Sequence, residues 1–273
     1  MTHAIDAVNV TKTYRKYARK KQFATLKSAL LSGSLVSELQ PDETFEALRG
    51  VSFTVPKGCT FGVIGRNGSG KSTLLKCIAG AEIATSGTIT LLGRDITAAT
   101  SPERARAGLS MKFQITAVLP QLSVYDNVLL ALQAGDSLFA LALSRSRRRL
   151  DERAMDFLAR FRLADRPDEL AGALSHGQQQ WLEIAMALAR EPKVLLLDEP
   201  TAGMSPQERR ATGELLVPIK THCSLLIVEH DLDFIKDLCD TLTVLDQGTV
   251  VASGPTQAVQ NDPKVKEAYL VHA

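Results

Sequence analysis

The sequence predicts an α/β protein, and three kinds of segment support this fold class. Residues 193–198 and 224–228 are continuous apolar runs, which suit strands that a parallel sheet buries on both faces. Residues 47–55 alternate apolar and polar side chains, as a half-exposed strand does. Residues 118–173 are instead rich in Leu, Ala and Arg at helical spacing and lack β-branched runs. We therefore expect a sheet-based core that carries an inserted helical subdomain.

Turn residues divide the remaining chain into further elements. A turn is expected at residues 85–87, before a strand over residues 88–92. A hairpin is expected at residues 246–248, because a glycine stands at the turn between two apolar runs. From Pro255 onward the chain is expected to be helical and peripheral.

The composition limits the classes of function. The chain has 273 residues and a formal net charge of +2, which gives no global electrostatic reason to expect binding to nucleic acid. No window approaches the roughly 20 apolar residues that span a bilayer, and the first residues lack the pattern of a signal peptide. Any membrane role is therefore expected to work through a partner. The cysteines lack metal-binding spacing and are expected to be reduced core residues of a cytosolic protein: Cys59, Cys77, Cys223 and Cys239.

Residues 65–72 fit the phosphate-binding pattern G-x-x-x-x-G-K-[ST], between a predicted strand and a predicted helix. Glycines let backbone N–H groups converge on phosphate oxygens at a helix N-terminus. Lys71 is expected to reach the β- and γ-phosphates, and the Ser72 hydroxyl to bind Mg²⁺. A glycine-rich turn that matches by chance would not account for both flanks. The predicted nucleotide-binding residues here are Gly65, Asn67, Gly68, Gly70, Lys71, Ser72 and Thr73.

Two carboxylates, Asp198 and Glu199, follow the apolar run that begins at Val194. Ligands of open α/β sheets sit at the carboxyl ends of the strands, so both side chains are expected near the phosphates. Asp198 can complete the Mg²⁺ shell, and Glu199 is placed to polarise a water for attack on the γ-phosphate. The alternative is a pair of ordinary surface acids, which the preceding phosphate-binding pattern makes less favoured.

Residues 174–178 read Leu-Ser-His-Gly-Gln and resemble the signature of ABC ATPases, usually Leu-Ser-Gly-Gly-Gln. A helix is predicted to begin at Ser175, upstream of the Asp198 strand by the spacing that this family has. The resemblance implies that Ser175, Gly177 and Gln178 contact ATP held by a second subunit, so that two cassettes close head to tail. The alternative is a plain helix cap, since Ser is common at this position.

The resemblance runs through nearly the whole chain and assigns three further residues. Tyr14 matches the aromatic residue that stacks on adenine. Gln114 matches the glutamine that contacts metal or water and links the core to the helical subdomain. His230 matches the switch histidine that contacts the γ-phosphate. With ATP and Mg²⁺ as cofactors, the implied catalytic residues are Lys71, Gln114, Glu199 and His230, and the implied metal ligands are Ser72, Gln114 and Asp198.

The fold that follows is a P-loop NTPase (RecA-like) core with an N-terminal antiparallel β subdomain and an inserted α-helical subdomain. The ATPase domain is expected over residues 1–255, with the core at about 1–117 and 174–255 and the helical subdomain at about 118–173. A helical tail is expected over residues 256–273. An insertion at about residues 15–46 carries a basic and then an acidic cluster. These charges suit acidic lipid headgroups or a partner, or form a solvated surface.

The resemblance implies an ATP-binding and ATP-hydrolysing subunit of an ABC transporter at the cytoplasmic face of the membrane. Its expected partners are transmembrane permease subunits, a second ATP-binding subunit and a periplasmic solute-binding protein, with no nucleic acid. The second half of the chain resembles cassettes of branched-chain amino acid and urea importers, notably at residues 228–231 and 262–270. The first third, through the insertion after Tyr14 and residues 65–68, instead resembles exporters of polysaccharide or teichoic acid.

Two residues depart from the family pattern. His176 replaces the first glycine of the signature, and Ser205 stands where many cassettes have an aspartate, which affects one expected contact between subunits. A soluble ABC ATPase acting on nucleic acid or ribosomes is less favoured, since the roughly 100 residues between Lys71 and Ser175 are too few for a coiled-coil arm. An unrelated P-loop kinase or GTPase would not account for the signature or for His230.

Overall fold

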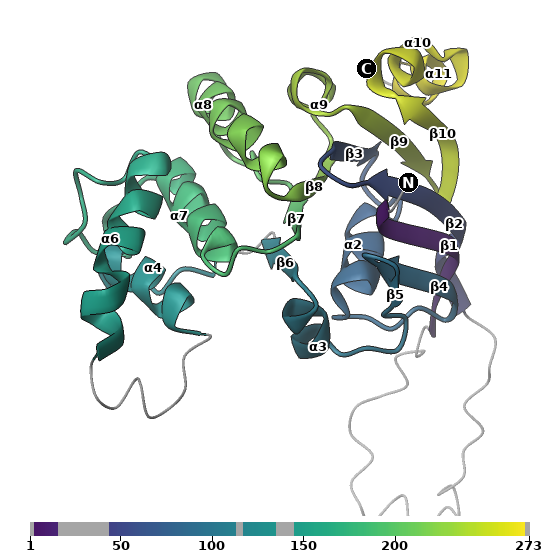
Figure 1. Ribbon diagram of the computed structural model, residues 1–273. Helices are drawn as coiled ribbons and strands as arrows, with labels where there is room; N and C mark the ends of the chain where they lie inside the picture. Colours follow the sequence, from purple (N-terminus) through teal and green to yellow (C-terminus); the bar gives the residue numbers. More distant parts are fainter. Residues whose placement is uncertain (1–2, 16–43, 113–116, 135–144, 271–273) are drawn as a thin grey trace, which may run out of the picture.

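A six-stranded sheet forms the centre of the fold in the computed structural model, which describes residues 3–15, 44–112, 117–134 and 145–270 (Figure 1). The strand order is β10-β9-β3-β8-β7-β6. All neighbouring strands are parallel except β10, which runs antiparallel to β9. The strands are β3 (Thr60–Gly65), β6 (Leu109–Lys112), β7 (Val194–Asp198), β8 (Ser224–Glu229), β9 (Thr241–Asp246) and β10 (Thr249–Pro255).

The inner strands consist mainly of apolar residues because both faces of this sheet are covered. Every residue of β3, β7 and β8 is buried. In β7, Val194 and Leu196 belong to one hydrophobic core, whereas Leu195 and Leu197 belong to the other. Successive side chains of a strand point to opposite faces, so a strand between two cores needs an unbroken apolar run. The prediction of strands buried on both faces is confirmed.

A second sheet of four antiparallel strands has the order β2-β1-β4-β5. Helix α2 (Lys71–Ala79) lies in the core that joins the two sheets, to which it contributes Leu74, Leu75 and Ile78. The N-terminal β subdomain of the predicted fold is therefore antiparallel, as expected. Its strands are β1 (His3–Arg15), β2 (Thr44–Pro56), β4 (Ser86–Leu91) and β5 (Arg94–Asp95).

The turn predicted at residues 85–87 is wrong, because Ser86 and Gly87 already belong to β4. Gly87 has φ +92°, and a side chain on it would lie 2.3 Å from the Asn9 carbonyl oxygen of β1. Asn9 itself has φ +50°, and the β1–β4 register shifts between Val8 and Thr11. A glycine within a strand marks a bulge or a close backbone approach as well as a turn, and here the partner strand decides between them.

Arg104 is a fully buried charge that ties helix α3 (Ser101–Arg106) to the end of α2. Its Nη1 donates hydrogen bonds to the carbonyl oxygens of Cys77 (2.6 Å) and Ile78 (2.8 Å). Its Nε and Nη2 donate to Ala99 and Thr97, so all three guanidinium nitrogens are bonded. The last carbonyls of α2, which have no partner inside the helix, are satisfied in this way.

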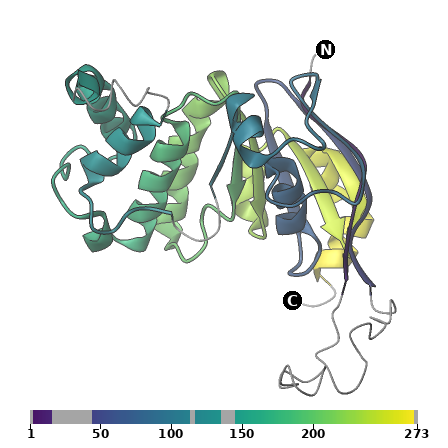
Figure 2. The ribbon, with the colours of Figure 1, turned by 90° about the horizontal axis from the view of Figure 1, so that it is seen from below.

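The remaining helices cover the other face of the six-stranded sheet and extend away from it. Figure 2 shows α4, α6 and α7 on the side of the molecule opposite to the four-stranded sheet. The predicted fold class, which includes an inserted helical part, is therefore confirmed. The residue boundaries given for this part stay a prediction. None of the described helices is long and apolar enough to cross a membrane. The helices are α4 (Val124–Gln133), α6 (Arg145–Arg160), α7 (His176–Leu188), α8 (Pro206–Leu216) and α9 (Leu232–Leu238).

The predicted hairpin and helical tail are both present. Gln247 (φ +45°) and Gly248 (φ +80°) form a two-residue turn between β9 and β10, as in a type I′ hairpin. The chain continues into α10 (Thr256–Asn261) and α11 (Pro263–Leu270). The tail is less peripheral than expected, since Val259 and Val265 are buried in the main core. Residues 16–43 of the predicted insertion, and Gln114, lie outside the described residues.

Gly62 of β3 offers a test of how tightly the core is packed. A Cβ at this position would lie 2.9 Å from Leu242, 3.0 Å from Ile235 and 3.1 Å from Cys239. We expect Gly62→Ala to lower the free energy of unfolding by about 1–3 kcal/mol, because an overfilled core strains its neighbours. The measurement is urea unfolding monitored by circular dichroism.

Gly213→Ala is the matched control, since a Cβ on Gly213 of α8 would lie 3.6 Å from Phe234, an ordinary contact. It is expected to leave stability unchanged or to raise it by up to about 1 kcal/mol, because alanine favours helices over glycine. Equal unfolding midpoints for Gly62→Ala and the wild type would contradict the tight packing.

Candidate functional site

The loop at residues 65–70 leads from β3 directly into the N-terminus of α2. Gly68 has φ +84° and Gly70 has φ +103°, conformations that side chains with a Cβ rarely adopt. Gly70 is the N-cap residue, and the first turn of α2 contains no acidic residue. Free backbone N–H groups and the positive end of the helix dipole therefore face the loop, an arrangement that binds anions.

Two distant segments support this loop from behind. A Cβ on Gly70 would lie 2.6 Å from the Ala47 carbonyl oxygen of β2, and one on Gly248 would lie 2.7 Å from the same oxygen. The Gly248 N–H donates to the Ser69 carbonyl (3.0 Å). A Cβ on Gly65 would collide with the Ser69 hydroxyl at 2.3 Å. Each of these glycines is needed because another segment approaches its backbone closely. The sequence pattern includes Gly65 and Gly70 but does not include Gly248.

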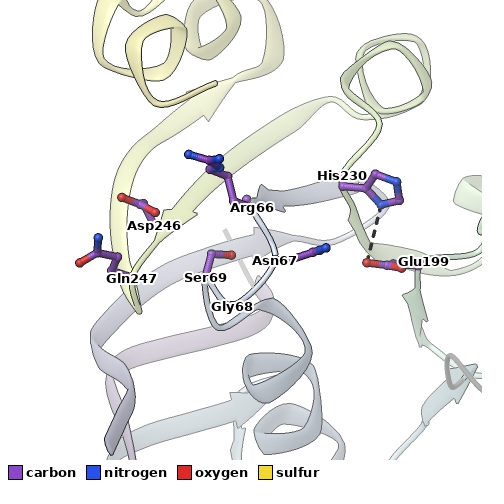
Figure 3. Close-up of a pocket in the computed structure, with 9 residues that line it drawn as sticks. Arg66, Asn67, Gly68, Ser69, Glu199, His230, Asp246 and Gln247 are labelled. Atoms are coloured by element: carbon purple, nitrogen blue, oxygen red, sulfur yellow. Dashed lines mark ion pairs between the residues drawn. The ribbon is translucent and has the colours of Figure 1, made fainter. Parts of the chain in front are cut away.

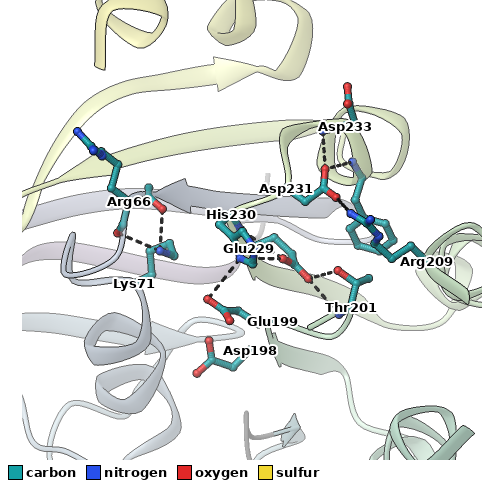
Figure 4. A network of polar contacts seen from close by, with 12 residues as sticks. Arg66, Lys71, Asp198, Glu199, Thr201, Arg209, Glu229, His230, Asp231 and Asp233 are labelled. Atoms are coloured by element: carbon teal, nitrogen blue, oxygen red, sulfur yellow. Dashed lines mark hydrogen bonds and ion pairs between the residues drawn. The ribbon is translucent and has the colours of Figure 1, made fainter. Parts of the chain in front are cut away.

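Lys71 is buried and turns back into the loop (Figure 4). Its Nζ donates hydrogen bonds to the carbonyl oxygens of Gly65 (2.7 Å) and Arg66 (3.1 Å). Burial lowers the pKa of the Lys71 ammonium, and the charges of Glu199 and Asp198 oppose this shift. The loop thus holds a positive charge beside its free N–H groups, as a polyphosphate requires.

Ser72 and Asp198 bring two oxygen donors together beside the loop. The Ser72 hydroxyl donates a hydrogen bond of 3.3 Å to Asp198 Oδ1. Burial raises the pKa of the Asp198 carboxyl, and the neighbouring Glu199 carboxylate raises it further. A hydroxyl next to a carboxylate suits Mg²⁺, which prefers oxygen ligands and keeps most of its shell as water or phosphate. Within the described ranges, no group of three or more His, Cys, Asp or Glu side chains could hold a metal by itself.

Glu199 and His230 line a cleft of about 640 Å³ above the loop (Figure 3). Glu199 Oε1 lies 3.7 Å from His230 Nδ1. This separation is longer than a direct hydrogen bond. Glu199 has φ +45°, a strained conformation of the kind that clusters at functional sites. The cleft is lined by Gly65, Arg66, Asn67, Gly68, Ser69, Glu199, His230, Asp246 and Gln247.

Glu229 is a fully buried carboxylate that the sequence did not mark as a site residue. It accepts hydrogen bonds from the Thr201 N–H (3.0 Å) and hydroxyl (2.6 Å), and from the His230 N–H (3.2 Å). It therefore fixes both the chain after Glu199 and the chain at His230. The only signal in the sequence is an acidic residue at the end of an apolar strand, directly before the predicted histidine.

Four residues of the cleft were not predicted as site residues. Arg66 and Ser69 lie within the predicted loop, at positions where the pattern accepts any residue. Asp246 and Gln247 come from the β9–β10 hairpin, which was predicted only as a turn. The hydrogen bond from the Gly248 N–H to the Ser69 carbonyl holds the hairpin against the loop. Such a contact between distant residues cannot be predicted from the local sequence.

The signature residues begin helix α7, and none of them lines the cleft of this chain. Ser175 is the N-cap, as predicted, and its hydroxyl accepts a hydrogen bond from the Gln178 N–H (3.2 Å). The Gln178 side chain in turn accepts from the Ser175 N–H (3.1 Å), which completes a capping box. A Cβ on the buried Gly177 would lie 2.5 Å from Glu208 Oε1.

Further predicted residues also lie outside the lining of the cleft: Tyr14, Gly70, Lys71, Ser72, Thr73 and Asp198. Tyr14 is half-buried near the end of β1, opposite Phe45 of β2, and Lys12 Nζ lies 5.0 Å from its ring centroid. Thr73 lies in the first turn of α2. The segment that contains Gln114 is not described, but the residues on both sides of it contact Glu183 of α7. Lys112 Nζ lies 3.8 Å from Glu183 Oε2, and the Ala117 N–H donates to Glu183 Oε1 (3.2 Å).

This geometry can be compared with known proteins. A family model described as "ABC transporter" matches residues 48–202, more than half of the chain. The chain belongs to the ABC transporter family. A second model, described as "Branched-chain amino acid ATP-binding cassette transporter", matches residues 249–270 of this ABC cassette. ATP hydrolysis coupled to transport is the activity of the family, so the predicted family and ATPase class are confirmed.

Relatives of this ABC cassette support the assignment along most of its length. It is 33% identical over 236 residues to the high-affinity branched-chain amino acid transport ATP-binding protein LivG of Salmonella typhimurium, covering 83% of this chain and 92% of that protein. It is 32% identical over 234 residues to the methionine import ATP-binding protein MetN of Vibrio cholerae. This alignment covers 84% of this chain and 66% of that protein.

A solved structure confirms the fold of the cassette. The ATP-binding cassette MJ1267 of an ABC transporter matches with a TM-score of 0.78 and 30% identity, covering 98% of this chain and 99% of that one. The ADP conformation of the same cassette gives a TM-score of 0.76 at 29% identity. Cassettes of this family bind ATP and ADP, form dimers and work with transmembrane permeases.

Lys71→Ala tests whether the loop binds phosphate. Removing the buried ammonium should weaken ATP binding about 10- to 100-fold, since hydrogen bonds to charged groups contribute about 1.5–3 kcal/mol. The measurement is titration of the purified chain with a fluorescent ATP analogue. Lys57→Ala, which removes an exposed lysine, is the control and should bind as the wild type does. Unchanged affinity in Lys71→Ala would contradict the assignment of the loop.

Proposed function

We propose that this cassette is the ATP-binding and ATP-hydrolysing subunit of a branched-chain amino acid or urea-type importer. The match of residues 249–270 to the branched-chain amino acid cassette model carries the choice of cargo class. These residues form β10, α10 and α11, and Val259 and Val265 pack into the main core. The similarity to LivG along 83% of the chain supports the same class.

The loop at residues 65–70 is proposed to hold the β- and γ-phosphates of ATP. Its glycines admit the phosphates to the N–H groups of α2, and Lys71 supplies the positive charge beside them. Ser72 and Asp198 are proposed to hold Mg²⁺, together with Gln114. When bound, this ion would neutralise negative charge that develops on the phosphate oxygens. Thr73 lies next to this group in the first turn of the helix.

Glu199 is proposed to orient the attacking water and to accept its proton. Its carboxylate opens into the cleft, beside Asp198 on one side and 3.7 Å from His230 on the other. His230 is proposed to donate a hydrogen bond to the γ-phosphate. Glu229 positions both residues through its bonds to Thr201 and to the His230 N–H.

A second copy of the chain, or a related cassette, is proposed to complete the site. Ser175, Gly177 and Gln178 lie at a helix N-terminus that suits a phosphate but do not line the cleft of their own chain. A head-to-tail dimer would place them over the partner's ATP. Tyr14 is proposed to stack on the adenine, near the end of β1.

The membrane arrangement is also a proposal. The cassette would lie at the cytoplasmic face of the membrane, bound to permease subunits that receive solute from a periplasmic solute-binding protein. The names of the relatives, which describe amino acid transport and import, support this arrangement.

Glu199→Gln tests the proposed role in hydrolysis. The amide keeps the shape of the side chain but cannot accept a proton, so we expect the turnover number for ATP to fall about 100-fold or more with ATP still bound. Steady-state phosphate release and ATP titration measure the two effects. Glu214→Gln removes an exposed acid paired with Arg162 and is expected to hydrolyse ATP normally. Turnover like that of the wild type in Glu199→Gln would exclude Glu199 as the base.

The cargo class is tested by purifying the cassette with its permease from membranes and measuring ATPase activity with candidate solutes. Leucine, isoleucine, valine, small amides and urea are the expected stimulants, because closure of the cassettes is coupled to transport. Polysaccharide or teichoic acid precursors serve as the contrasting set. Stimulation by that set alone would replace the importer with an exporter.

A further inference from the structure

The histidine that departs from the signature pattern contacts the chain that follows Glu199. His176 Nε2 lies 3.1 Å from the carbonyl oxygen of Ala202. A carbonyl only accepts hydrogen bonds, so Nε2 carries the proton and donates it. Ala202 belongs to residues 199–205, the loop that joins β7 to α8 and is here called the 199–205 loop. A glycine at position 176 could not make this bond.

The 199–205 loop transmits this contact to Glu199. The Ala202 N–H donates to the carbonyl oxygen of Glu199 (3.2 Å), while the Ala202 carbonyl receives the bond from His176. One residue therefore has its N–H bonded to the carbonyl of the proposed base and its carbonyl bonded to the signature helix. A chain of hydrogen bonds therefore runs from the first residue of α7 through Ala202 to the backbone of Glu199.

The rest of the 199–205 loop is held too firmly to absorb such a displacement. Thr201 is bonded to the buried Glu229 through both its N–H and its hydroxyl. Met204 is buried, and its N–H donates to the Thr201 carbonyl (3.1 Å). Gly203 has φ +72°, and a Cβ there would lie 3.2 Å from the His176 ring. Hydrogen bonds and packing on three sides thus leave the loop little freedom.

A second contact joins the same two segments through Glu208 of α8. The Ser175 hydroxyl lies 3.4 Å from Glu208 Oε1, and Ser205 donates to Glu208 Oε2 from its N–H and its hydroxyl, both at 2.9 Å. The close approach of Gly177 to this carboxylate completes the junction. The signature turn and the 199–205 loop are therefore joined at two points, of which only the His176 contact leads directly to Glu199.

We propose that His176 is a positioning residue that couples the signature turn to Glu199 of the same chain. The inference rests on the proposed function, in which this turn faces the ATP of a second cassette. Binding of the partner's nucleotide would set the start of α7, and His176 would pass that position through Ala202 to the base of the chain's own site. Occupancy of one site would in this way favour hydrolysis in the other, which is a coupling between two sites.

The test compares ATP hydrolysis by the full chain as wild type, His176→Ala and His176→Gln over a range of ATP concentrations. A hydrogen bond of this kind changes a rate or equilibrium about 2- to 10-fold. We expect His176→Ala to lower kcat by that factor, to change KM less than twofold, and to bring the Hill coefficient down to about one. His176→Gln keeps an N–H donor and is expected to recover most of kcat and of the cooperativity.

His222→Ala is the matched control, because it removes another exposed histidine, located after the short helix at Val217–Thr221. It should behave as the wild type does. Since His176 is exposed at the start of its helix, His176→Ala should keep the thermal unfolding midpoint of the wild type.

Three results would overturn the inference alone: His176→Ala with the kcat and Hill coefficient of the wild type, His176→Gln as impaired as His176→Ala, or a wild-type Hill coefficient of one. An absence of ATP hydrolysis by the wild type would instead contradict the proposed function, and the inference with it. The two failures are therefore distinguishable in one set of measurements.

Discussion

The Ala47 carbonyl oxygen is the point on which the arrangement of this cassette depends. The backbones of three segments meet there: β2, the start of α2 and the β9–β10 hairpin. Gly70 and Gly248 lie so close to this oxygen that a Cβ on either would collide with it. The contact fixes the antiparallel sheet, which carries Tyr14, relative to the parallel sheet, which carries Glu199 and His230. In the proposed function Tyr14 contacts the base and the loop holds the phosphates of one nucleotide, which requires a rigid relation between the two sheets.

Buried charge gives the site its second constraint. Asp198 and Glu229 end adjacent parallel strands and are removed from water, which costs free energy unless each is compensated. Glu229 accepts three hydrogen bonds and becomes a structural anchor, whereas Asp198 accepts a hydrogen bond from the Ser72 hydroxyl and has a pKa that burial raises. The two carboxylates therefore differ in role: Glu229 organises the protein, and Asp198 is the one proposed to bind a cation.

The sequence predicted the elements whose signal is local. The apolar runs gave the buried strands, Gly248 the hairpin, and Ser175 the start of α7. It failed at Gly87, since a glycine that signals a turn also fits a bulge, and only the position of Asn9 on the neighbouring strand decides. Glu229 and the contact of Glu208 with Ser175 were missed for the same reason, because Thr201 and Ser175 are distant from these carboxylates in the chain. Ser205, a departure from the family pattern, is the N-cap of α8 in this fold.

Arg104 compensates the charge at one end of helix α2 and leaves the other end uncompensated. Aligned peptide dipoles place about half a positive charge at the start of a helix and half a negative charge at its end. The buried guanidinium lies on the carbonyls of Cys77 and Ile78, so the negative pole is matched inside the protein. The positive pole at Gly70 faces no acid of its own first turn. The helix thus directs an uncompensated positive pole at the loop, and its attraction for anions depends in part on a residue at the opposite end.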